Sequence, residues 1–425
     1  MTPLVLQWSR WTHGVPTSAR TLHRLRPLVG SGLLVAVGYV DPGNWATDIA
    51  AGAHYGTALL GVVVLASLMG ILFQNLSARL AMATGEDLAQ AVMMHLGRGP
   101  QWVARWGGEV AILATAVAEL MGGALALALL WHWSLLVGVL TTAAGTLLVL
   151  ALSQRGQVVL ERVVATLMAV VAGCFAELLW RAQPHVGTVL SGAVTLPSGA
   201  PWPVMLLALG IVGATVMPHN LYLHAGLVAE RLAGVRPGDR ALAWRVIRND
   251  TRLALTIALL VNAAMLVVAA TALTGLGQGL ASLTQAHAVL GTTLGSSMAV
   301  LFAVGLYAAG QSSAMTGVLA GQMLTRGFGR ATTGLWRRAI LTRLLGGSAL
   351  MGVLTAWPGV GADRVLVGTQ SVLGLCLPMA LVPLAVLVTR PQVMGPMVVR
   401  GPWAVVTWTA TAAVAALDLA LAGWA

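Results

Sequence analysis

Long apolar runs recur along nearly the whole 425-residue chain, and no other feature constrains its fold as strongly. Each run is about 20 residues long, the length of helix that crosses a hydrocarbon layer roughly 30 Å thick. Helices satisfy their backbone hydrogen bonds internally, so repeated runs of this kind predict an α-helical bundle in a membrane. Only 9% of the residues are charged, against roughly 25% in soluble domains, which argues against a soluble globular protein.

The apolar runs predict about 11 transmembrane helices. We place them at residues 28–54, 57–82, 107–131, 134–153, 159–180, 203–229, 253–275, 296–323, 337–355, 364–388 and 402–423. Between them we expect a short interfacial helix within residues 83–104 and an external loop at residues 181–201. Residues 1–27 lack a clear cleavage site and are predicted to be a retained cytoplasmic tail.

The net charge of +11 comes entirely from arginine, because the sequence contains no lysine. With a cytoplasmic N-terminus, alternating helices leave only Arg181 and Arg364 on the outer side. This follows the positive-inside rule and explains the charge without nucleic acid. A cluster in one predicted cytoplasmic loop is interpreted as a topological anchor, with a lipid-binding switch as the alternative. It comprises Arg231, Arg236, Arg240, Arg245, Arg248 and Arg252.

The cysteines and the overall composition indicate the compartment. Cys174 and Cys376 lie in separate apolar runs with no CxxC spacing, which supports neither a disulfide framework nor a zinc site. An all-arginine cation set, abundant Gly, Trp and Pro, and no organelle-targeting pattern favour a bacterial inner (plasma) membrane.

Two of the predicted helices are interrupted in the same way. The first run contains Asp41-Pro42-Gly43-Asn44, and the sixth contains Met217-Pro218-His219-Asn220. Proline removes a backbone donor, so each helix should break there, and the freed groups must face a cavity or an ion. Breaks in helices one and six predict two inverted five-helix repeats, at residues 28–180 and 203–388, followed by an eleventh helix at 402–423.

The two breaks offer a set of metal ligands. Asp41 and Asn44 supply hard oxygens, the freed carbonyl near Ala214 supplies another, and Met217 supplies a thioether. Asp41 and Asn44 could instead cap the second half-helix, and Met217 could fill the core. Several oxygens with one soft sulfur suit Mn²⁺ or Fe²⁺ better than Ca²⁺ or Mg²⁺, which take all-oxygen shells.

The motifs at the two breaks, DPGN and ATVMPHNLYLH, resemble the Nramp (natural-resistance-associated macrophage protein) family of proton-coupled divalent-metal transporters. GQSSAMTGVLAGQ (310–322) and TQSVLGLCLPMALVPL (369–384) resemble the family's eighth and tenth helices, so the likeness covers about residues 28–390. It implies a LeuT-type fold, and it implies a metal site made of Asp41, Asn44, the Ala214 carbonyl and Met217. Gln370 matches a tenth-helix position that joins this shell in some states.

The resemblance also implies a set of proton-linked residues. His219 and His224 follow the sixth-helix break, Glu119 lies in the third helix and Arg343 in the ninth. A titratable histidine near Asp41 and a buried Glu–Arg pair fit a proton relay, although each histidine could simply form an interhelical hydrogen bond. Glu109 is a further candidate, on an exit path.

The chain departs from the family pattern at two positions. Ala116 stands where many members have an acidic residue one turn before Glu119, and Cys376 stands where the family usually shows Gln. Losing the acid removes one proton acceptor, which leaves the route and tightness of proton coupling open. Cys376 is interpreted as a small buried hydrophobe, with a contribution to the metal site as the alternative.

These observations favour a monomeric transporter that imports Mn²⁺, with Fe²⁺ as a further candidate, by alternating access with proton co-transport. The metal and protons are transported substrates, and no cofactor is expected. A LeuT-type symporter of a small organic substrate is one alternative, and an uncoupled metal channel or sensor is another. An enzyme is not expected, since the sequence contains neither HExxH nor GxSxG.

Overall fold

The computed structural model describes residues 28–153, 156–196, 201–273, 282–329, 334–357 and 359–422. Throughout these ranges the regular structure is helical, with no strand. Eight of the described helices are long and apolar enough to cross a membrane. The fold prediction of an all-α membrane protein is confirmed, whereas the predicted tail at residues 1–27 lies outside the described residues.

Eight helices are continuous over the length of the bundle. They are α5 (Leu60–Thr84), α7 (Arg98–Trp131), α8 (Leu135–Ser153), α9 (Gln157–Ala182), α13 (Arg240–Ala272), α15 (Ser296–Gly327), α16 (Leu335–Ala356) and α17 (Ala362–Val388). Two predicted spans are each divided into two shorter helices. These are α3 (Ser31–Gly38) with α4 (Pro42–Tyr55), and α11 (Trp202–Thr215) with α12 (Pro218–Leu232). The last span is α19 (Pro402–Ala422).

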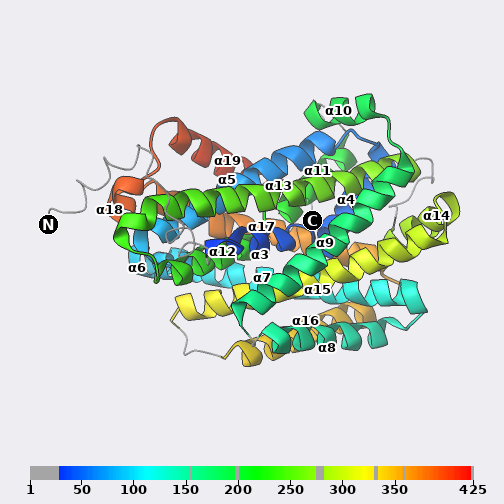
Figure 1. The fold of residues 1–425 in the computed structure, drawn as a ribbon, viewed down its shortest axis with the longest axis horizontal. Helices are drawn as coiled ribbons and strands as arrows, with labels where there is room; N and C mark the ends of the chain where they lie inside the picture. Colours follow the sequence, from blue (N-terminus) through cyan, green and yellow to red (C-terminus); the bar gives the residue numbers. More distant parts are fainter. Residues whose placement is uncertain are drawn as a thin grey trace.

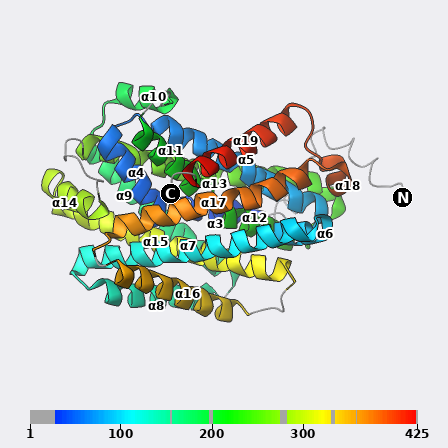
Figure 2. The same cartoon turned by 180° about the vertical axis from the view of Figure 1, so that it is seen from behind.

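Short helices lie at the two ends of the bundle. At one end Figure 1 shows α6 (Leu88–His95) and α18 (Pro391–Met394), and at the opposite end it shows α10 (Val186–Val194) and α14 (Leu283–Thr293). The view from behind in Figure 2 has the same arrangement. The connections η3 (Pro237–Asp239) and η4 (Gly395–Met397) complete the described helical turns. Transmembrane helices that alternate in direction place their connecting segments at the two ends of the bundle, and these short helices lie in such segments.

The two divided spans lie beside one another in the core. The first half of one contacts the second half of the other, since α3 packs on α12 and α4 packs on α11. The two spans therefore run in opposite directions, and their breaks meet. Around them, α13 packs along α3, α4 and α5, while α7 packs along α15 and α17. Trp45 fixes α4 laterally, because its ring makes edge contacts with Phe175 at 4.7 Å and Phe302 at 5.3 Å.

Three sequence predictions on the connections need correction or extension. The arginine-rich stretch was predicted to be a loop, but α12 extends to Leu232 and α13 already begins at Arg240, so five of its six arginines lie on helices. Similarly, α7 begins at Arg98 and not near residue 107. The external segment is not an irregular loop throughout, because it contains α10. The short helix predicted within residues 83–104 is confirmed as α6.

Candidate metal site

The break between α3 and α4 follows directly from Pro42. A helix continuing through this point would need an N–H at residue 42 to pair with the carbonyl of Gly38, and proline has none. The residue before a proline is also driven to extended backbone, and Asp41 has φ −72° and ψ 165°. Pro42 then occupies the first turn of α4, where no N–H is needed. Asp41 is thereby held at the break, 0% exposed.

The second break repeats this logic. Met217 precedes Pro218 and is extended, with φ −80° and ψ 125°. In a continuous helix the Ala214 carbonyl would accept from the N–H of residue 218, which proline lacks. That carbonyl is consequently free for another partner at the end of α11.

Asn44 joins the two breaks. Its side-chain amide donates to Asp41 Oδ1 at 2.9 Å and to the Ala214 carbonyl oxygen at 3.2 Å. Its backbone N–H also donates to Asp41 Oδ1 at 2.9 Å, so Asp41 caps α4. The capping interpretation therefore accounts for one carboxylate oxygen of Asp41, but not for the other.

Three buried oxygens meet at this junction without a hydrogen-bond partner among the described residues. They are Asp41 Oδ2, Asn44 Oδ1 and Gln370 Oε1, all on side chains at most 1% exposed. Gln370 comes from α17 and lies directly against Gly43, where a Cβ would overlap its amide group. Leaving buried polar atoms unpaired costs free energy unless a ligand satisfies them. Around a bound cation, such oxygens would gain the partner they lack.

Met217 completes the donor set. Its side chain is 0% exposed, and its sulfur accepts from Asn220 Nδ2 at 3.7 Å. Within the described part of the chain there is no group of three or more His, Cys, Asp or Glu side chains placed to hold a metal. The junction instead combines one carboxylate with amide and carbonyl oxygens and a thioether. Such a mixed set suits a divalent transition metal of intermediate softness.

The two candidate histidines differ in their surroundings. His219 Nδ1 lies 3.3 Å from Thr115 Oγ1 on α7, and its Nε2 has no partner among the described residues. His224 has both nitrogens occupied, by Gln74 Oε1 at 3.2 Å and Thr251 Oγ1 at 3.3 Å. His224 thus forms the interhelical hydrogen bonds considered as its alternative role, while His219 keeps one nitrogen open beside the break.

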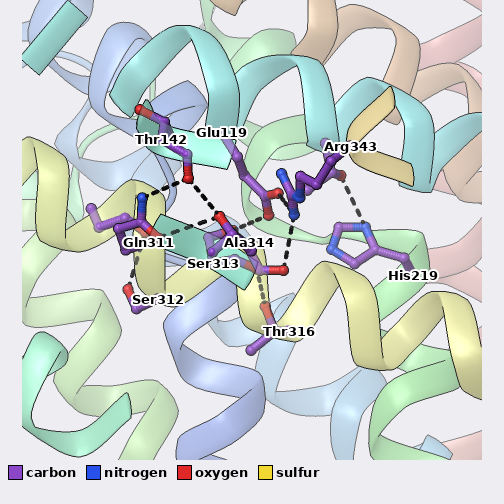
Figure 3. Close-up of polar contacts among 12 residues, drawn as sticks. Glu119, Thr142, His219, Gln311, Ser312, Ser313, Ala314, Thr316 and Arg343 are labelled. Atoms are coloured by element: carbon purple, nitrogen blue, oxygen red, sulfur yellow. Dashed lines mark hydrogen bonds and ion pairs between the residues drawn. The ribbon is translucent and has the colours of Figure 1, made fainter. Parts of the chain in front are cut away.

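Glu119 and Arg343 form an ion pair in the interior, shown in Figure 3. Arg343 Nη2 donates to Glu119 Oε2 at 2.7 Å and to the Ala314 carbonyl at 3.0 Å, and Ser313 Oγ donates to Glu119 Oε1 at 3.0 Å. The Arg343 side chain is 3% exposed and the Glu119 side chain is 0% exposed. Pro42 packs on Gly122 of α7, one turn from Glu119, so the ion pair lies close to the first break.

Glu109 forms a second pair nearer the α6 end of α7. Arg338 holds it with two hydrogen bonds, of 2.6 and 3.3 Å. This pair borders a cavity of about 290 Å³ between α7 and α16. Glu119 and Glu109 are ten residues apart, or about 15 Å along the helix. Their arginine partners lie on α16 in the same order, so the two pairs form a ladder from the break toward the α6 end.

Three residues of this region were missed by the sequence analysis. Arg338 was counted only among cytoplasmic arginines, and Thr115 carries no signal of its own. Asp48 lies on α4 one turn after Asn44, is 1% exposed, and has an Oδ2 without a partner among the described residues. A carboxylate inside an apolar run is the signal that could have identified it.

Comparison with known proteins decides the family. The family model described as natural resistance-associated macrophage protein-like matches residues 32–423. The chain belongs to the Nramp family. Its Nramp relatives include the divalent metal cation transporter MntH of Mesorhizobium japonicum, 41% identical over 96% of this chain and 91% of the relative. MntH 1 of Pseudomonas aeruginosa is 43% identical over 96% of this chain and 93% of the relative.

Solved structures agree with the Nramp assignment. The manganese transporter of Eremococcus coleocola superposes with a TM-score of 0.82 at 30% identity, covering 96% of this chain and 88% of that one. Two further structures share the fold alone. Mhp1, a nucleobase-cation-symport-1 family transporter, and MhsT each give a TM-score of 0.61 at 15% identity. The LeuT-type fold prediction is confirmed, and the protein is a membrane transporter, not an enzyme.

The two departures from the Nramp pattern have local explanations. Ala116 packs face to face with Gly346 of α16, so a small residue at 116 lets α7 and α16 approach closely. Cys376 lies in a small buried cluster with Ala111, Ala114 and Leu373. This surrounding is apolar, which fits the interpretation of Cys376 as a buried hydrophobe.

Proposed function

We propose that this Nramp protein imports Mn²⁺, with Fe²⁺ as a second substrate, by proton-coupled alternating access. The observation that carries the proposal is the junction of the two broken helices. There Asp41 Oδ2, Asn44 Oδ1 and Gln370 Oε1 are buried without partners among the described residues, beside the thioether of Met217. These atoms and the Ala214 carbonyl are the proposed metal ligands. The Nramp relatives are named as divalent metal cation and manganese transporters, which agrees with a divalent metal as the substrate.

The ligand set explains why a transition metal would be preferred. One carboxylate contributes a single negative charge, so a divalent ion keeps a net positive charge that neutral oxygens must stabilise. Ca²⁺ prefers more oxygen ligands, and Mg²⁺ gives up its water reluctantly. A thioether sulfur adds little for either ion but is acceptable to Mn²⁺ and Fe²⁺.

We propose that the broken helices are also the part of the protein that moves during transport. Two half-helices that end at one site can tilt without breaking hydrogen bonds in the continuous helices around them. We propose that the broken spans of the repeats 28–180 and 203–388 rock against the other helices and open the site to each side in turn. The site residues are fully buried, which corresponds to a closed state between the two openings.

Protons are proposed to leave the site along α7. His219 has an open nitrogen beside the break, and the pairs Glu119–Arg343 and Glu109–Arg338 continue the series of titratable groups. Glu119 can accept a proton while Arg343 stays bound to the Ala314 carbonyl, and Glu109 can accept one if Arg338 shifts. His224, with both nitrogens occupied, is the least accessible member of the proposed relay.

The orientation is proposed from the arginines. The α6 end of the bundle carries nearly all of the described arginines, while Arg181 and Arg364 lie toward the α10 and α14 end. The positive-inside rule then places the α6 end in the cytoplasm of a bacterium and the tail 1–27 on the same side. We propose the protein as a monomer in the inner membrane, with α19 outside the two repeats.

An organic substrate is the nearest rival, because carriers of this fold include a structure bound to L-phenylalanine. In such a carrier the first broken helix would receive the substrate carboxylate at its exposed backbone. Asp41 has its own carboxylate there, and it would repel a second one. The metal proposal is therefore favoured.

Uptake by reconstituted protein tests the proposal. Purified wild type and Asp41→Ala are placed in liposomes with an inward proton gradient, and Mn²⁺ entry and internal pH are followed together. We expect saturable Mn²⁺ uptake with internal acidification in the wild type and neither in Asp41→Ala, because removing the carboxylate removes the only anionic ligand. Asp239→Ala, on η3 and away from the junction, is the matched control and should behave as wild type.

The possible outcomes separate the alternatives. Mn²⁺ uptake without acidification would keep the metal site but contradict proton coupling. Mn²⁺ uptake that does not saturate, at channel-like rates, would indicate a channel. If no divalent ion enters, the transport proposal is wrong and an organic substrate or a sensor has to be considered.

A further inference from the structure

A groove on the outer surface of the bundle is unexplained by metal transport. It lies between α5, α13 and the start of α19, toward the α6 end, and encloses about 380 Å³. Three arginines line it: Arg79 from α5, and Arg248 and Arg252 from α13. None of the proposed metal ligands lines this groove.

The three arginines lack an acidic partner in the part of the chain that the structure describes. Among the described residues no carboxylate lies within ion-pair distance of Arg79, Arg248 or Arg252. Arg79 is fixed in position, because its guanidinium donates to the carbonyls of Met397 at 2.7 Å and Val398 at 3.3 Å. Arg248 Nε is buried with no hydrogen-bond partner among the described residues. Positively charged side chains held together without a counter-charge indicate a binding site for an anion.

The rest of the groove is amphipathic. Trp244 and Trp403 flank the arginines, and Trp403 is 65% exposed. Leu68 and Leu72 extend the lining along α5 away from the arginines, and Leu68 is 53% exposed. Tryptophan is enriched where a membrane meets water, and exposed leucines belong in the hydrocarbon layer. The groove therefore has a cationic end at the headgroup level and an apolar end within the bilayer.

We propose that this groove binds one anionic phospholipid from the leaflet at the α6 end. Its phosphate would lie between Arg79, Arg248 and Arg252, in the position that supplies the missing anion. An acyl chain would follow Leu68 and Leu72 along α5. Basic pockets between transmembrane helices are the type of site that anionic headgroups occupy. Bound there, the lipid would join α5, α13 and α19, which belong to different parts of the chain.

Charge and shape exclude other occupants. Residues 1–27 include four arginines and no acidic residue, so this segment would be repelled by the groove. A free phosphate ion would use the arginines but leave the tryptophans and leucines without a role. A zwitterionic lipid would bring a cationic group to an already cationic site.

Lipid binding to the purified protein tests the proposal. Native mass spectrometry of the full chain in detergent is recorded while phosphatidylglycerol or phosphatidylcholine is titrated in. The wild type is compared with Arg248→Gln/Arg252→Gln, which removes two cations and leaves Arg79 bound to its carbonyls. The matched control is Arg236→Gln/Arg240→Gln, which removes two exposed arginines at the same end but outside the groove.

We expect the wild type to retain one phosphatidylglycerol in preference to phosphatidylcholine. The groove variant should bind phosphatidylglycerol at least roughly tenfold more weakly, and the control should stay within about twofold of wild type. Equal binding by all three proteins would overturn the proposal in favour of nonspecific surface charge. So would equal affinity for phosphatidylcholine, or displacement of the lipid by millimolar inorganic phosphate, which would indicate a free-anion site.

Folding of the variants is checked by size exclusion. If the double variant does not fold, Arg252→Gln replaces it, because Arg252 is exposed. The headgroup preference of the wild type needs no variant, and a wild type without preference would by itself overturn the proposal.

Discussion

At the level of single residues, Met217 is the proposed ligand whose chemistry is easiest to isolate. Its thioether is buried at the second break, where an oxygen ligand would serve Ca²⁺ or Mg²⁺ better. We expect Met217→Ala to leave Mn²⁺ uptake measurable but to let Ca²⁺ and Mg²⁺ compete roughly tenfold better, because the vacated space admits water oxygen as a ligand. The measurement is inhibition of Mn²⁺ uptake by each ion in proteoliposomes.

A second buried methionine provides the control for that experiment. Met168 lies on α9 in the apolar core, so Met168→Ala creates a similar loss of volume without touching the junction. Its competition curves should match the wild type. Unchanged competition in Met217→Ala would contradict a selective role for the sulfur and return Met217 to the core-filling interpretation.

The sequence predicts those site residues whose positions are decided by local chemistry. Pro42 and Pro218 fix where the helices break, and with them the placement of Asp41, Met217 and the Ala214 carbonyl. Partners that meet only in the folded molecule carry no such signal. Glu109 and Arg338 are 229 positions apart and pair with no spacing rule. Gln370 was reached only through family resemblance.

At the level of elements, hydropathy locates the membrane part of a helix but not its ends. The first turns of α13 are rich in arginine, so the apolar run starts later than the helix. The same reason explains the early start of α7 at Arg98. The interrupted spans were predictable because proline acts locally, whereas α10 has too short a run to distinguish it from a loop.

Helix α6 offers a test of electrostatics outside the membrane. Asp87 caps it, accepting from Gln90 N at 2.8 Å, and its burial raises the pKa of this carboxyl to about 6. Arg326 opposes that shift and Glu230 adds to it. Because the folded pKa exceeds the unfolded value of about 4, folding takes up a proton between these values. The stabilising contribution of the Asp87 carboxyl is thus fully present at low pH and is lost as pH rises through about 6.

The prediction is a pH-dependent effect of Asp87→Asn. The amide can still cap the helix but never becomes charged, so the variant should melt a few degrees higher than wild type at pH 7.5 and no higher at pH 4.5. Thermal unfolding in detergent at both pH values measures the difference. Asp239→Asn, on η3 and in no ion pair among the described residues, is the control and should show no such crossover. The same difference in melting temperature between Asp87→Asn and wild type at both pH values would contradict the prediction.

At the level of the whole molecule, coupling requires that the metal site and the proton path respond to one another. Pro42 packs on α7 one turn from Glu119, so movement of the first broken span bears directly on the helix that carries both carboxylates. In the proposed rocking motion, Asp41 would therefore lie at the contact between the broken span that moves and the helices that stay in place. The small residues Ala116 and Gly346 let α7 and α16 pack closely, which would hold the two Glu–Arg pairs together during that motion.

Removing the charge of Glu119 should uncouple the two functions. Ser313 and Arg343 donate to different oxygens of Glu119, so Glu119→Gln keeps an acceptor for one of them, and its amide cannot take up a proton. We expect Mn²⁺ binding near the wild-type affinity and loss of proton-driven uptake. Binding is measured by calorimetry, and uptake with internal pH is measured in liposomes. Since Arg343 is left without its counter-charge, Glu119→Gln/Arg343→Gln separates coupling from stability. Glu177→Gln breaks an exposed pair on α9 and should change neither quantity. Acidification that keeps pace with Mn²⁺ entry in Glu119→Gln would mean that protons bypass this pair, and Asp48 beside the first break would then be the carboxylate to change next.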